Sequence, residues 1–273
     1  HYLGLSAGID KEGKFFDSLN SLGFSFIEVG TFTPLPQKGN KYPRIKRLPN
    51  QSLINSLGFN NPGILEGIKN ARKSKHNFSG VLGISIGKNK STSLDEAYKD
   101  YNFCLEHCYQ EADYIAINIS SPNTLDLRKL SSTDYIEDLT REINLKKEKL
   151  EKKYSKKVPL FLKLSPDEKE ENLQKIISTS LSNNFSGFIV SNTMKGNSKG
   201  ISGGISGDLL KNKSCEILRK VQGLVGNEVI LIASGGISTK VDVEERLDNG
   251  AKLIQIYTSF VYRGPTIVNE LLN

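Results

Sequence analysis

The chain has 273 residues, enough for one large domain or two small ones, and 37% of them are hydrophobic, which is low but sufficient for a core. A net charge of +7 would suit a nucleic-acid or membrane-surface role, but much of it lies in residues 146–157, where interspersed acids indicate a solvated helix end instead. Three scattered cysteines exclude a disulfide framework, and the three histidines form no recognisable motif, so neither a histidine-based mechanism nor a zinc site is expected.

The N-terminus begins inside an apolar, strand-like run at His1 and lacks an initiator methionine. We therefore interpret the sequence as a fragment or trimmed chain, from which any N-terminal targeting or membrane segment would be absent. No apolar run approaches the ~20 residues that a membrane-spanning helix needs, and no signal peptide is visible.

Eight short apolar or β-branched segments recur along the chain. Most are continuously apolar rather than alternating, which is typical of parallel strands covered on both faces. The predicted strands are residues 3–7, 26–33, 81–87, 114–120, 160–164, 187–191, 229–233 and 253–257.

Helix-like segments lie between these strands, at residues 14–22, 94–108, 167–181 and 208–224. Ser165 is a candidate N-cap for the third of them, and Ser238 is expected to cap one more helix that ends at Gly250. Cys104 and Cys108 lie four residues apart on a predicted helix. A metal pair is an alternative there, but no histidine or cysteine partner sits at ligand spacing, so core packing is expected.

Eight strand–helix units in one chain predict an α/β fold, a (β/α)8 TIM barrel, with residues 1–273 forming a single domain. The alternative is an open doubly wound sheet, which usually shows G-x-G-x-x-G after its first strand. Here residues 7–13 read AGIDKEG and do not match. Residues 34–62 break the rhythm as a long segment rich in Pro, Gly and Asn, and such loops are commonly lids or substrate-binding loops.

Polar residues gather where the predicted strands end, which is where barrel active sites lie. The fourth strand runs directly into Asn118, Ser120, Ser121, Asn123 and Thr124. Polar groups of this kind cost about 1–3 kcal/mol each if they are buried without a partner. A turn or a helix cap is the plainer interpretation, because Ser-Pro-Asn is good turn chemistry.

Lys163 lies in the middle of the fifth predicted strand, between Leu162 and Leu164. Its side chain either points outward to solvent or points into the barrel mouth. Few carboxylates are available at the strand ends to pair with it, so a ligand that carries negative charge is its expected partner.

The segment after the seventh strand, Gly235-Gly236, leads into the helix that Ser238 is expected to cap. Phosphate sites in barrels often form from the loops after strands seven and eight, together with a helix N-terminus. Ser206-Gly207 would add further donors. These residues predict a phosphorylated cofactor across the barrel mouth, with a small, polar, planar substrate held by asparagine and lysine side chains.

Nine motifs occur in order between residue 2 and about residue 270. They are Ala7-Gly-Ile-Asp-Lys11, Glu28-Val-Gly-Thr31, Asn55-Ser-Leu-Gly-Phe-Asn60, Gly83-Ile-Ser-Ile-Gly-Lys-Asn-Lys90, Ala116-Ile-Asn-Ile-Ser-Ser-Pro-Asn-Thr124, Ser191-Asn-Thr193, Gly203-Gly-Ile-Ser-Gly207, Ala233-Ser-Gly-Gly236 and Gln255-Ile-Tyr257. Together they resemble the dihydroorotate dehydrogenases of class 2, the membrane-associated, quinone-reducing class.

The resemblance implies oxidation of (S)-dihydroorotate to orotate in pyrimidine biosynthesis, with FMN as hydride acceptor and a quinone as final electron acceptor. It implies peripheral association with an inner membrane, either the bacterial one, facing the cytoplasm, or the mitochondrial one. The resemblance implies docking on the membrane through an N-terminal helical extension, which we expect to be absent from residues 1–273. No nucleic-acid partner is implied.

The resemblance also implies a role for each matching residue. Ser121 would be the catalytic base, helped by a relay through Thr124 and closed off from solvent by Phe59, because serine alone is a weak base. The substrate would be held by Lys11, Asn55, Ser56, Leu57, Gly58, Phe59, Asn118, Asn123, Asn192 and Thr193.

The cofactor and quinone sites follow from the same resemblance. The FMN would contact Ala7, Gly8, Lys11, Thr31, Ser85, Asn118, Lys163, Ser191, Ser206, Gly207, Gly235, Gly236, Tyr257 and Thr258. The positive charge of Lys163 would favour the reduced anionic flavin. The quinone tunnel would meet the flavin at Ile45, Arg47 and Tyr257.

Two positions distinguish this chain within the family pattern. Ser121 separates it from the soluble class, which uses cysteine there. Asp126 stands where relatives usually have glycine, so the lid after the base loses freedom for positive φ.

Two other functions remain as alternatives. A tRNA dihydrouridine synthase would fit the basic charge, but that family uses a cysteine acid and has an RNA-binding helical domain that is not visible here. The other alternative is a non-redox binding protein on a barrel scaffold.

Overall fold

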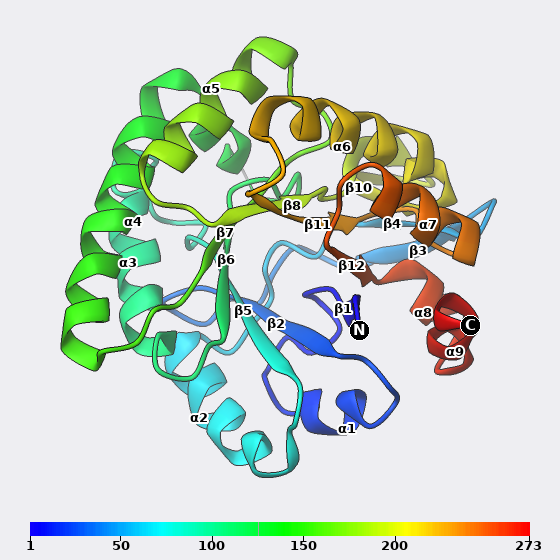
Figure 1. Cartoon of the computed structure of the whole chain (residues 1–273), viewed down its shortest axis with the longest axis horizontal. Coiled ribbons are helices and arrows are strands. Elements are labelled where there is room, and N and C mark those ends of the chain that lie inside the picture. Colours follow the sequence, from blue (N-terminus) through cyan, green and yellow to red (C-terminus); the bar gives the residue numbers. More distant parts are fainter. Residues whose placement is uncertain (125) are drawn as a thin grey trace.

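Eight parallel strands form a closed barrel in this computed structural model, which describes residues 1–124 and 126–273, without the side chains of Thr133 and Asp134 (Figure 1). The barrel strands are β1 (Leu3–Leu5), β2 (Phe26–Phe32), β5 (Val81–Ile86), β6 (Tyr114–Asn118), β7 (Leu160–Lys163), β8 (Gly187–Val190), β11 (Ile230–Ser234) and β12 (Leu253–Ile256). Each predicted strand overlaps one of them, and the prediction of a TIM barrel is confirmed.

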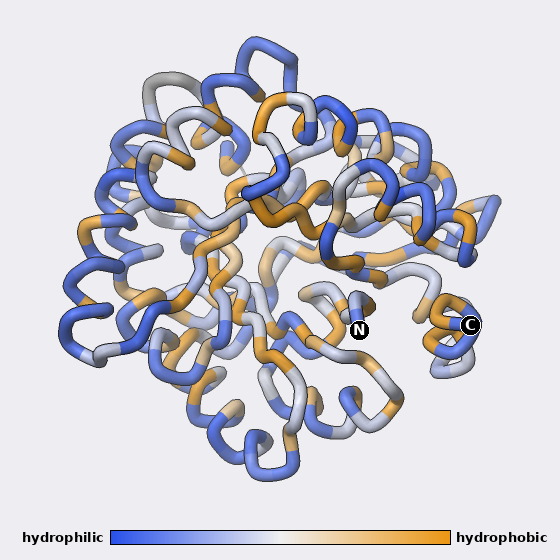
Figure 2. Tube along the Cα trace, in the orientation of Figure 1, coloured by the Kyte–Doolittle hydropathy of each residue, from blue (hydrophilic) through white to orange (hydrophobic). Residues whose placement is uncertain are grey.

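Helices follow the strands and surround the barrel. They are α1 (Phe16–Asn20), α2 (Ile64–Ser74), α3 (Ala97–Cys108), α4 (Thr133–Tyr154), α5 (Glu170–Ser182), α6 (Lys211–Val225), α7 (Lys240–Asp248), α8 (Thr258–Arg263) and α9 (Thr266–Leu272), with 3-10 turns η1 (Lys75–Asn77), η2 (Leu127–Ser131) and η3 (Asp208–Leu210). Figure 2 shows hydrophobic residues gathered on the strands and hydrophilic residues along the outer turns of the helices.

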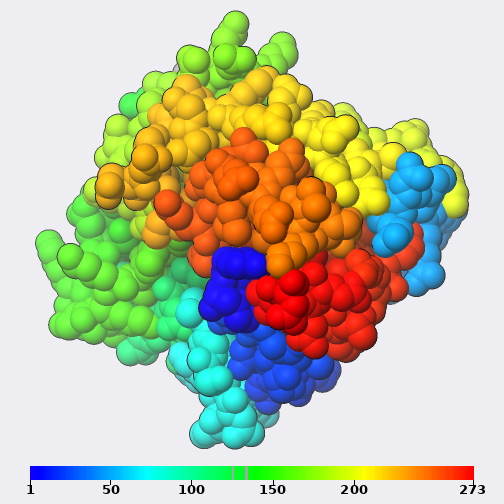
Figure 3. Space-filling view, turned by 45° about the vertical axis from the view of Figure 1, so that its right-hand side comes forward, coloured from blue at the N-terminus to red at the C-terminus, as the bar shows by residue number. Residues whose placement is uncertain are grey.

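The ends of the chain close the barrel. β1 pairs in parallel with both β2 and β12, and the Tyr2 hydroxyl donates to the Leu271 carbonyl at 3.3 Å. Figure 3 shows the first residues packed beside the C-terminal segment. The fold therefore depends on contacts between residues at opposite ends of the sequence.

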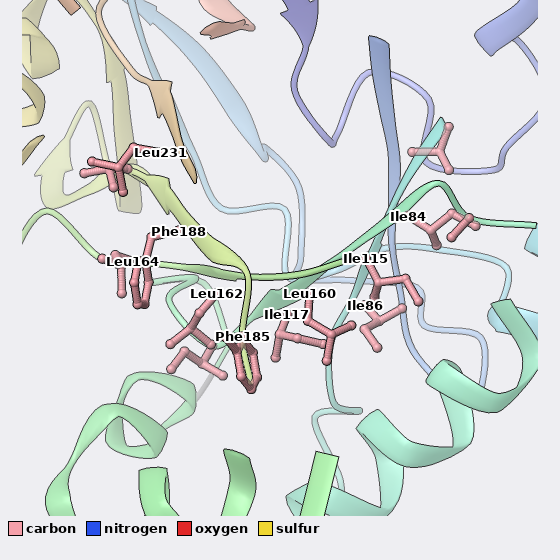
Figure 4. Close-up of a cluster of buried hydrophobic side chains, with 14 of the residues drawn as sticks. Ile84, Ile86, Ile115, Ile117, Leu160, Leu162, Leu164, Phe185, Phe188 and Leu231 are labelled. Carbon is pink, nitrogen blue, oxygen red and sulfur yellow. The ribbon is translucent and has the colours of Figure 1, made fainter. Parts of the chain in front are cut away.

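Alternate residues of each barrel strand face opposite ways. Ile115 and Ile117 of β6, and Leu160 and Leu162 of β7, belong to the large core between barrel and helices (Figure 4). Phe26, Tyr114, Ala116, Phe161, Ile189 and Ile232 form a separate cluster. Burial of an aliphatic or aromatic side chain stabilises the fold by roughly 1.5–3 kcal/mol. Strands buried on both faces explain the continuous apolar runs of the sequence.

A second sheet of four antiparallel strands was not predicted. Its order is β3 (Ile45–Leu48), β4 (Ser52–Asn55), β10 (Ile201–Gly207) and β9 (Met194–Ser198). Two of these strands lie within residues 34–62, which the sequence suggested to be a long loop. The apolar signal is weak there because Leu48, Ile54 and Ile201 are the buried members of its small core.

The two predicted helix caps are wrong. α7 begins after Thr239, whose hydroxyl accepts from the Asp242 amide at 3.2 Å while the Asp242 carboxylate accepts from the Thr239 amide at 2.9 Å. Ser238 donates to Asp242 instead of capping the helix. Ser165 accepts from the Asp167 amide at 3.1 Å and so stabilises a turn before α5, which starts only at Glu170.

Two other expectations are confirmed. Cys104 and Cys108 are both buried in the core. The lysine-rich segment 146–157 covers the last part of α4 and the residues after it, with Lys152 and Lys153 exposed in the final turn.

Candidate functional site

A cavity opens at the carboxyl ends of the barrel strands. Its wall is formed by residues at or after the ends of seven barrel strands, all except β5, and by β4, β10 and the segments that follow them. All predicted catalytic, cofactor and substrate residues line this cavity except Thr124, Ser85 and Ser56.

The three exceptions lie behind the cavity wall. The Ser85 hydroxyl is 2.9 Å from that of Thr31, which does line the cavity. Ser56 accepts a hydrogen bond from the Asn40 side chain at 3.3 Å. Thr124 is buried, and its hydroxyl has no partner among the described residues.

The predicted quinone residues are spread more widely. Tyr257 lines the cavity, where burial raises the pKa of its hydroxyl. Ile45 and Arg47 lie on β3 outside the cavity wall, and Ile45 is 44% exposed. The Arg47 guanidinium lies 5.0 Å from the centre of the Tyr262 ring.

Asparagine side chains from three segments, at the ends of β4, β6 and β8, form two hydrogen-bonded pairs at the cavity. Asn192 donates to the side-chain oxygen of Asn118 at 3.2 Å and to the Ser120 hydroxyl at 3.0 Å. Asn123 donates to the side-chain oxygen of Asn55 at 2.7 Å, and Asn55 donates to a backbone carbonyl of β10. These bonds fix the orientation of each amide.

One consequence is a buried acceptor without a partner beside the cavity. The nitrogen of the Asn123 amide is bound to Asn55, and its buried side-chain oxygen has no partner among the described residues. A buried carbonyl oxygen without a partner costs about 1–3 kcal/mol.

Ser121 follows β6 and is 6% exposed. Its hydroxyl oxygen accepts a weak hydrogen bond from the Asn123 backbone amide at 3.3 Å. No histidine or carboxylate is bonded to it among the described residues, so any base chemistry has to pass its proton to another hydroxyl or to water.

Lys11 follows β1 and lines the same cavity. The buried Asp10 carboxylate accepts from the backbone amides of Lys14 at 3.1 Å and Phe15 at 2.7 Å, which holds the loop that carries Lys11. Burial, and then the positive charge of Arg44, lower the pKa of Lys11 to about 8. A desolvated ammonium in a cavity is suited to bind a carboxylate.

Arg128 ties three of these segments together from behind. Its guanidinium donates to the carbonyls of Ser120 at 2.9 Å and Thr193 at 2.8 Å, and to the Asp167 carboxylate at 2.7 Å. Asp167 also pairs with Lys213, and these hydrogen bonds and charges lower its pKa despite burial. The residues next to Ser121 are thus supported by Arg128 and its ion pair with Asp167.

Asp126 precedes this arginine in a left-handed conformation, with φ of 56°. The chain therefore keeps the positive φ that glycine would provide, and it does so with a residue type that tolerates it better than most. Its carboxylate pairs with Lys129 at 3.0 Å.

Lys163 points into the barrel, where a carboxylate that does not lie at a strand end pairs with it. Its ammonium lies 3.4 Å from the Glu28 carboxylate on β2. Glu28 is inside the barrel rather than at a strand end, which is why the sequence did not indicate it. Tyr114 and Gln255 also bond to Glu28, and these three residues were missed as parts of the site. A charged or amide residue within an apolar strand, as in FIEVG and LIQI, was the available signal.

The glycine-rich end of the cavity has little room for side chains. A Cβ on Gly236 would lie 2.3 Å from the Lys211 Cα, and one on Gly207 would lie 2.4 Å from the Gln51 carbonyl oxygen. Both glycines have positive φ. Beside them, Thr258 donates to the Ser206 hydroxyl at 2.8 Å. Close-packed glycine backbone with hydroxyls at this end of a barrel fits a phosphate group.

Comparisons with known proteins agree with this geometry. The family model described as dihydroorotate dehydrogenase matches residues 2–273. The dihydroorotate dehydrogenase (quinone) of Buchnera aphidicola subsp. Schizaphis graminum is 43% identical over 278 residues, which cover 99% of this chain and 82% of that protein. The enzyme of the same name from Vibrio atlanticus is 41% identical with the same coverage. A crystal structure of DHODH from Eimeria tenella in complex with ferulenol has a TM-score of 0.92 at 34% identity, covering 98% of this chain and 78% of that one.

Proposed function

The chain belongs to the dihydroorotate dehydrogenase family, and we infer that it is a quinone-dependent member, which oxidises dihydroorotate to orotate in pyrimidine biosynthesis. Family membership implies a flavin cofactor. The observation that carries the proposal is the convergence of Lys11, Ser121, Lys163 and the linked asparagines on one cavity.

We propose FMN as the flavin. Its phosphate would be held by the backbone around Gly207 and Gly235-Gly236, with the hydroxyls of Ser206 and Thr258, and its ring would lie over Lys163. The support is that the crowded glycine backbone and the buried Lys163 ammonium line the same cavity. When bound, FMN would supply the acceptor for the hydride of C6 of dihydroorotate and the electron carrier to the quinone.

The chain itself binds and deprotonates the substrate in this proposal. Lys11 pairs with the dihydroorotate carboxylate, and the asparagines that line the cavity hydrogen-bond its ring. Ser121 removes the proton from C5, and Thr124, whose buried hydroxyl lacks a partner among the described residues, takes part in passing that proton on. Phe59 lines the cavity and excludes water.

Quinone-dependent members of the family are membrane-associated in general. In the part of the chain that the structure describes, no helix is long and apolar enough to cross a bilayer. We propose peripheral association of a single barrel domain with an inner membrane, on the cytoplasmic side in a bacterium, through an N-terminal segment. The quinone would approach the flavin near Ile45, Arg47 and Tyr257.

The decisive experiment adds dihydroorotate to the purified flavoprotein without oxygen and follows the flavin band near ~450 nm. Wild-type protein should bleach. Ser121→Ala should keep its flavin and bleach with dithionite, but bleach with dihydroorotate at least ~100-fold more slowly, because a general base contributes about 10²–10⁴-fold. Near-normal bleaching in that variant would refute the role of Ser121, and a wild-type flavoprotein that never bleaches would refute the substrate. Ser178→Ala, a serine exposed on α5, serves as the matched control.

A further inference from the structure

A buried polar cluster lies inside the barrel below the cavity. Glu28 of β2 accepts hydrogen bonds from Tyr114 of β6 at 3.1 Å and from Gln255 of β12 at 2.8 Å, and it pairs with Lys163 of β7 at 3.4 Å. The Gln255 amide also donates to the Tyr114 hydroxyl at 3.0 Å. Four of the eight barrel strands thus contribute to one network.

The Glu28 carboxylate acts only as a hydrogen-bond acceptor. Its side chain is 0% exposed, and each of its three partners is a donor, which is the pattern of an ionised carboxylate. Burial, and then the charge of Glu28, raise the pKa of Tyr114, so its hydroxyl keeps its proton and remains a donor. A buried carboxylate persists only when it is paired in this way.

The two charges of the pair stand at different depths. Lys163 lines the cavity, whereas Glu28 does not. The ammonium has three donors, of which one is directed to Glu28 and one to the Ser6 hydroxyl at 3.3 Å. One donor therefore remains for a ligand above it.

The cluster lies where its charges would act on the cofactor. This step rests on the proposed function, because it assumes a flavin bound above Lys163. A flavin ring over Lys163 would take up electrons directly above a positive charge that has a negative charge beneath it. In a buried site, charges a few ångströms apart interact strongly because water does not screen them.

We propose that Glu28 is a positioning residue of the flavin site. It fixes the Lys163 ammonium at the floor of the cavity and offsets part of its charge, so that the Glu28–Lys163 pair, rather than Lys163 alone, sets the reduction potential of the bound flavin. Gln255 and Tyr114 hold the carboxylate in the place where it does so.

The test measures the midpoint potential of the flavin in the purified holoenzyme by enzymatic reduction with indicator dyes, which needs no dihydroorotate. Glu28→Gln keeps the shape of the side chain and removes its charge. The potential should become more positive, with the ratio of reduced to oxidised flavin at a fixed poise rising roughly tenfold or more. Glu96→Gln, which removes the same charge from an exposed Glu–Lys pair, should leave the potential unchanged.

A second variant separates a role through Lys163 from a merely structural one. In a Lys163→Met background, Glu28→Gln should shift the potential much less than in wild-type protein, because the two residues act as a unit. If Glu28→Gln does not fold, Glu28→Asp keeps the charge but withdraws it from Lys163, and the potential should shift in the same direction by a smaller amount.

The outcomes are distinct. A variant that loses thermal stability but keeps the wild-type potential would overturn the inference and leave Glu28 a purely structural residue. Equal shifts in both backgrounds would overturn the claim that it acts through Lys163. Wild-type flavin that ignores dihydroorotate while its potential still responds to Glu28→Gln would refute the proposed function and leave this inference standing.

Discussion

The environment of Lys11 destabilises its charged form as long as no anionic ligand is bound beside it. Burial, and then the charge of Arg44, lower the pKa of Lys11 to about 8 in the free protein. The unfolded chain therefore binds more protons than the folded one between about pH 8 and pH 10.5, and this residue makes the free protein more stable as pH rises through that window. A bound carboxylate would raise the pKa of Lys11 and so stabilise its protonated form.

The first prediction follows for the pH dependence of binding. The dissociation constant of orotate should be nearly constant below pH 7, about double by pH 8, and rise about fivefold more between pH 8 and pH 9, as the free lysine loses its proton. Flavin absorbance changes measure this titration. Lys11→Arg is the matched control, since arginine stays charged and should remove the pH dependence. A constant affinity from pH 7 to pH 9 in wild-type protein would contradict the role of Lys11.

Arg128 carries the second prediction. Lysine cannot reproduce its three bonds, to Ser120, Thr193 and Asp167, because one ammonium lacks the planar fork of a guanidinium. Arg128→Lys should lower the free energy of unfolding by about 1–3 kcal/mol and should weaken orotate binding, since the segments around Ser121 and Asn192 lose their common support.

Denaturant unfolding and orotate titration measure the two effects of Arg128→Lys. Arg141→Lys on α4 is the control, because Arg141 is half-exposed and contacts only neighbouring acids of its own helix among the described residues. Unchanged orotate affinity with reduced stability would show that Arg128 supports the fold but not the site.

At the scale of single elements, apolar continuity made the barrel strands predictable. Segments such as YIAIN and LFLK are buried on both faces, so their composition reports their environment directly. The small sheet gave no such signal. β9 and β10 read MKGNS and ISGGISG, and β9 has no fully buried residue, so their pairing depends on the barrel mouth that supports them. Helix caps failed for a related reason, because several Ser and Thr residues precede α7 and only geometry selects Thr239.

Gly223 offers a prediction that belongs to one helix. It lies exposed within α6, and a Cβ there would meet nothing within 4 Å. Gly223→Ala should therefore raise the free energy of unfolding, by up to about 1 kcal/mol, because alanine restricts the unfolded chain and favours helix.

Gly236→Ala is the opposite case, since its Cβ would lie 2.3 Å from the backbone of Lys211 at positive φ. It should destabilise the protein and weaken flavin binding. Thermal unfolding and flavin content measure both variants. A destabilising Gly223→Ala would show that this turn of α6 is not regular helix in solution.

At the scale of the whole molecule, the barrel explains why so much of the cavity could be predicted. Parallel strands bring their carboxyl ends to one rim, so polar residues that follow them must meet once the strands are assigned. Pairings inside the barrel do not follow from that rule. Glu28 and Lys163 are 135 residues apart, and Glu28 and Gln255 are 227 apart. Their contact requires the closed strand order, which no local pattern contains.

Because the strand ends meet at one rim, a flavin bound there would contact several of them at once and stabilise the fold. The last prediction tests this stabilisation. Removing the flavin should leave Lys163 and the glycine backbone around Gly236 without the group that satisfies them. A ligand present at 100 to 1,000 times its dissociation constant stabilises the native state by about 3–4 kcal/mol, so apoprotein should melt roughly 5–10 °C lower. Calorimetry of apoprotein and FMN-reconstituted protein measures this shift.

Riboflavin, which has the ring but no phosphate, should restore only part of the lost melting temperature if the glycine-rich end binds phosphate. Hydrogen exchange should locate the change, with faster exchange at residues 203–210 and 234–238 of the apoprotein and little change in α4, on the outside of the barrel. Equal melting temperatures with and without FMN, or full recovery with riboflavin, would contradict a phosphate site at the ends of β10 and β11. Faster exchange throughout the barrel would instead show that the rim and the core unfold as one unit, since the stability of a local opening is set by the contacts that it breaks.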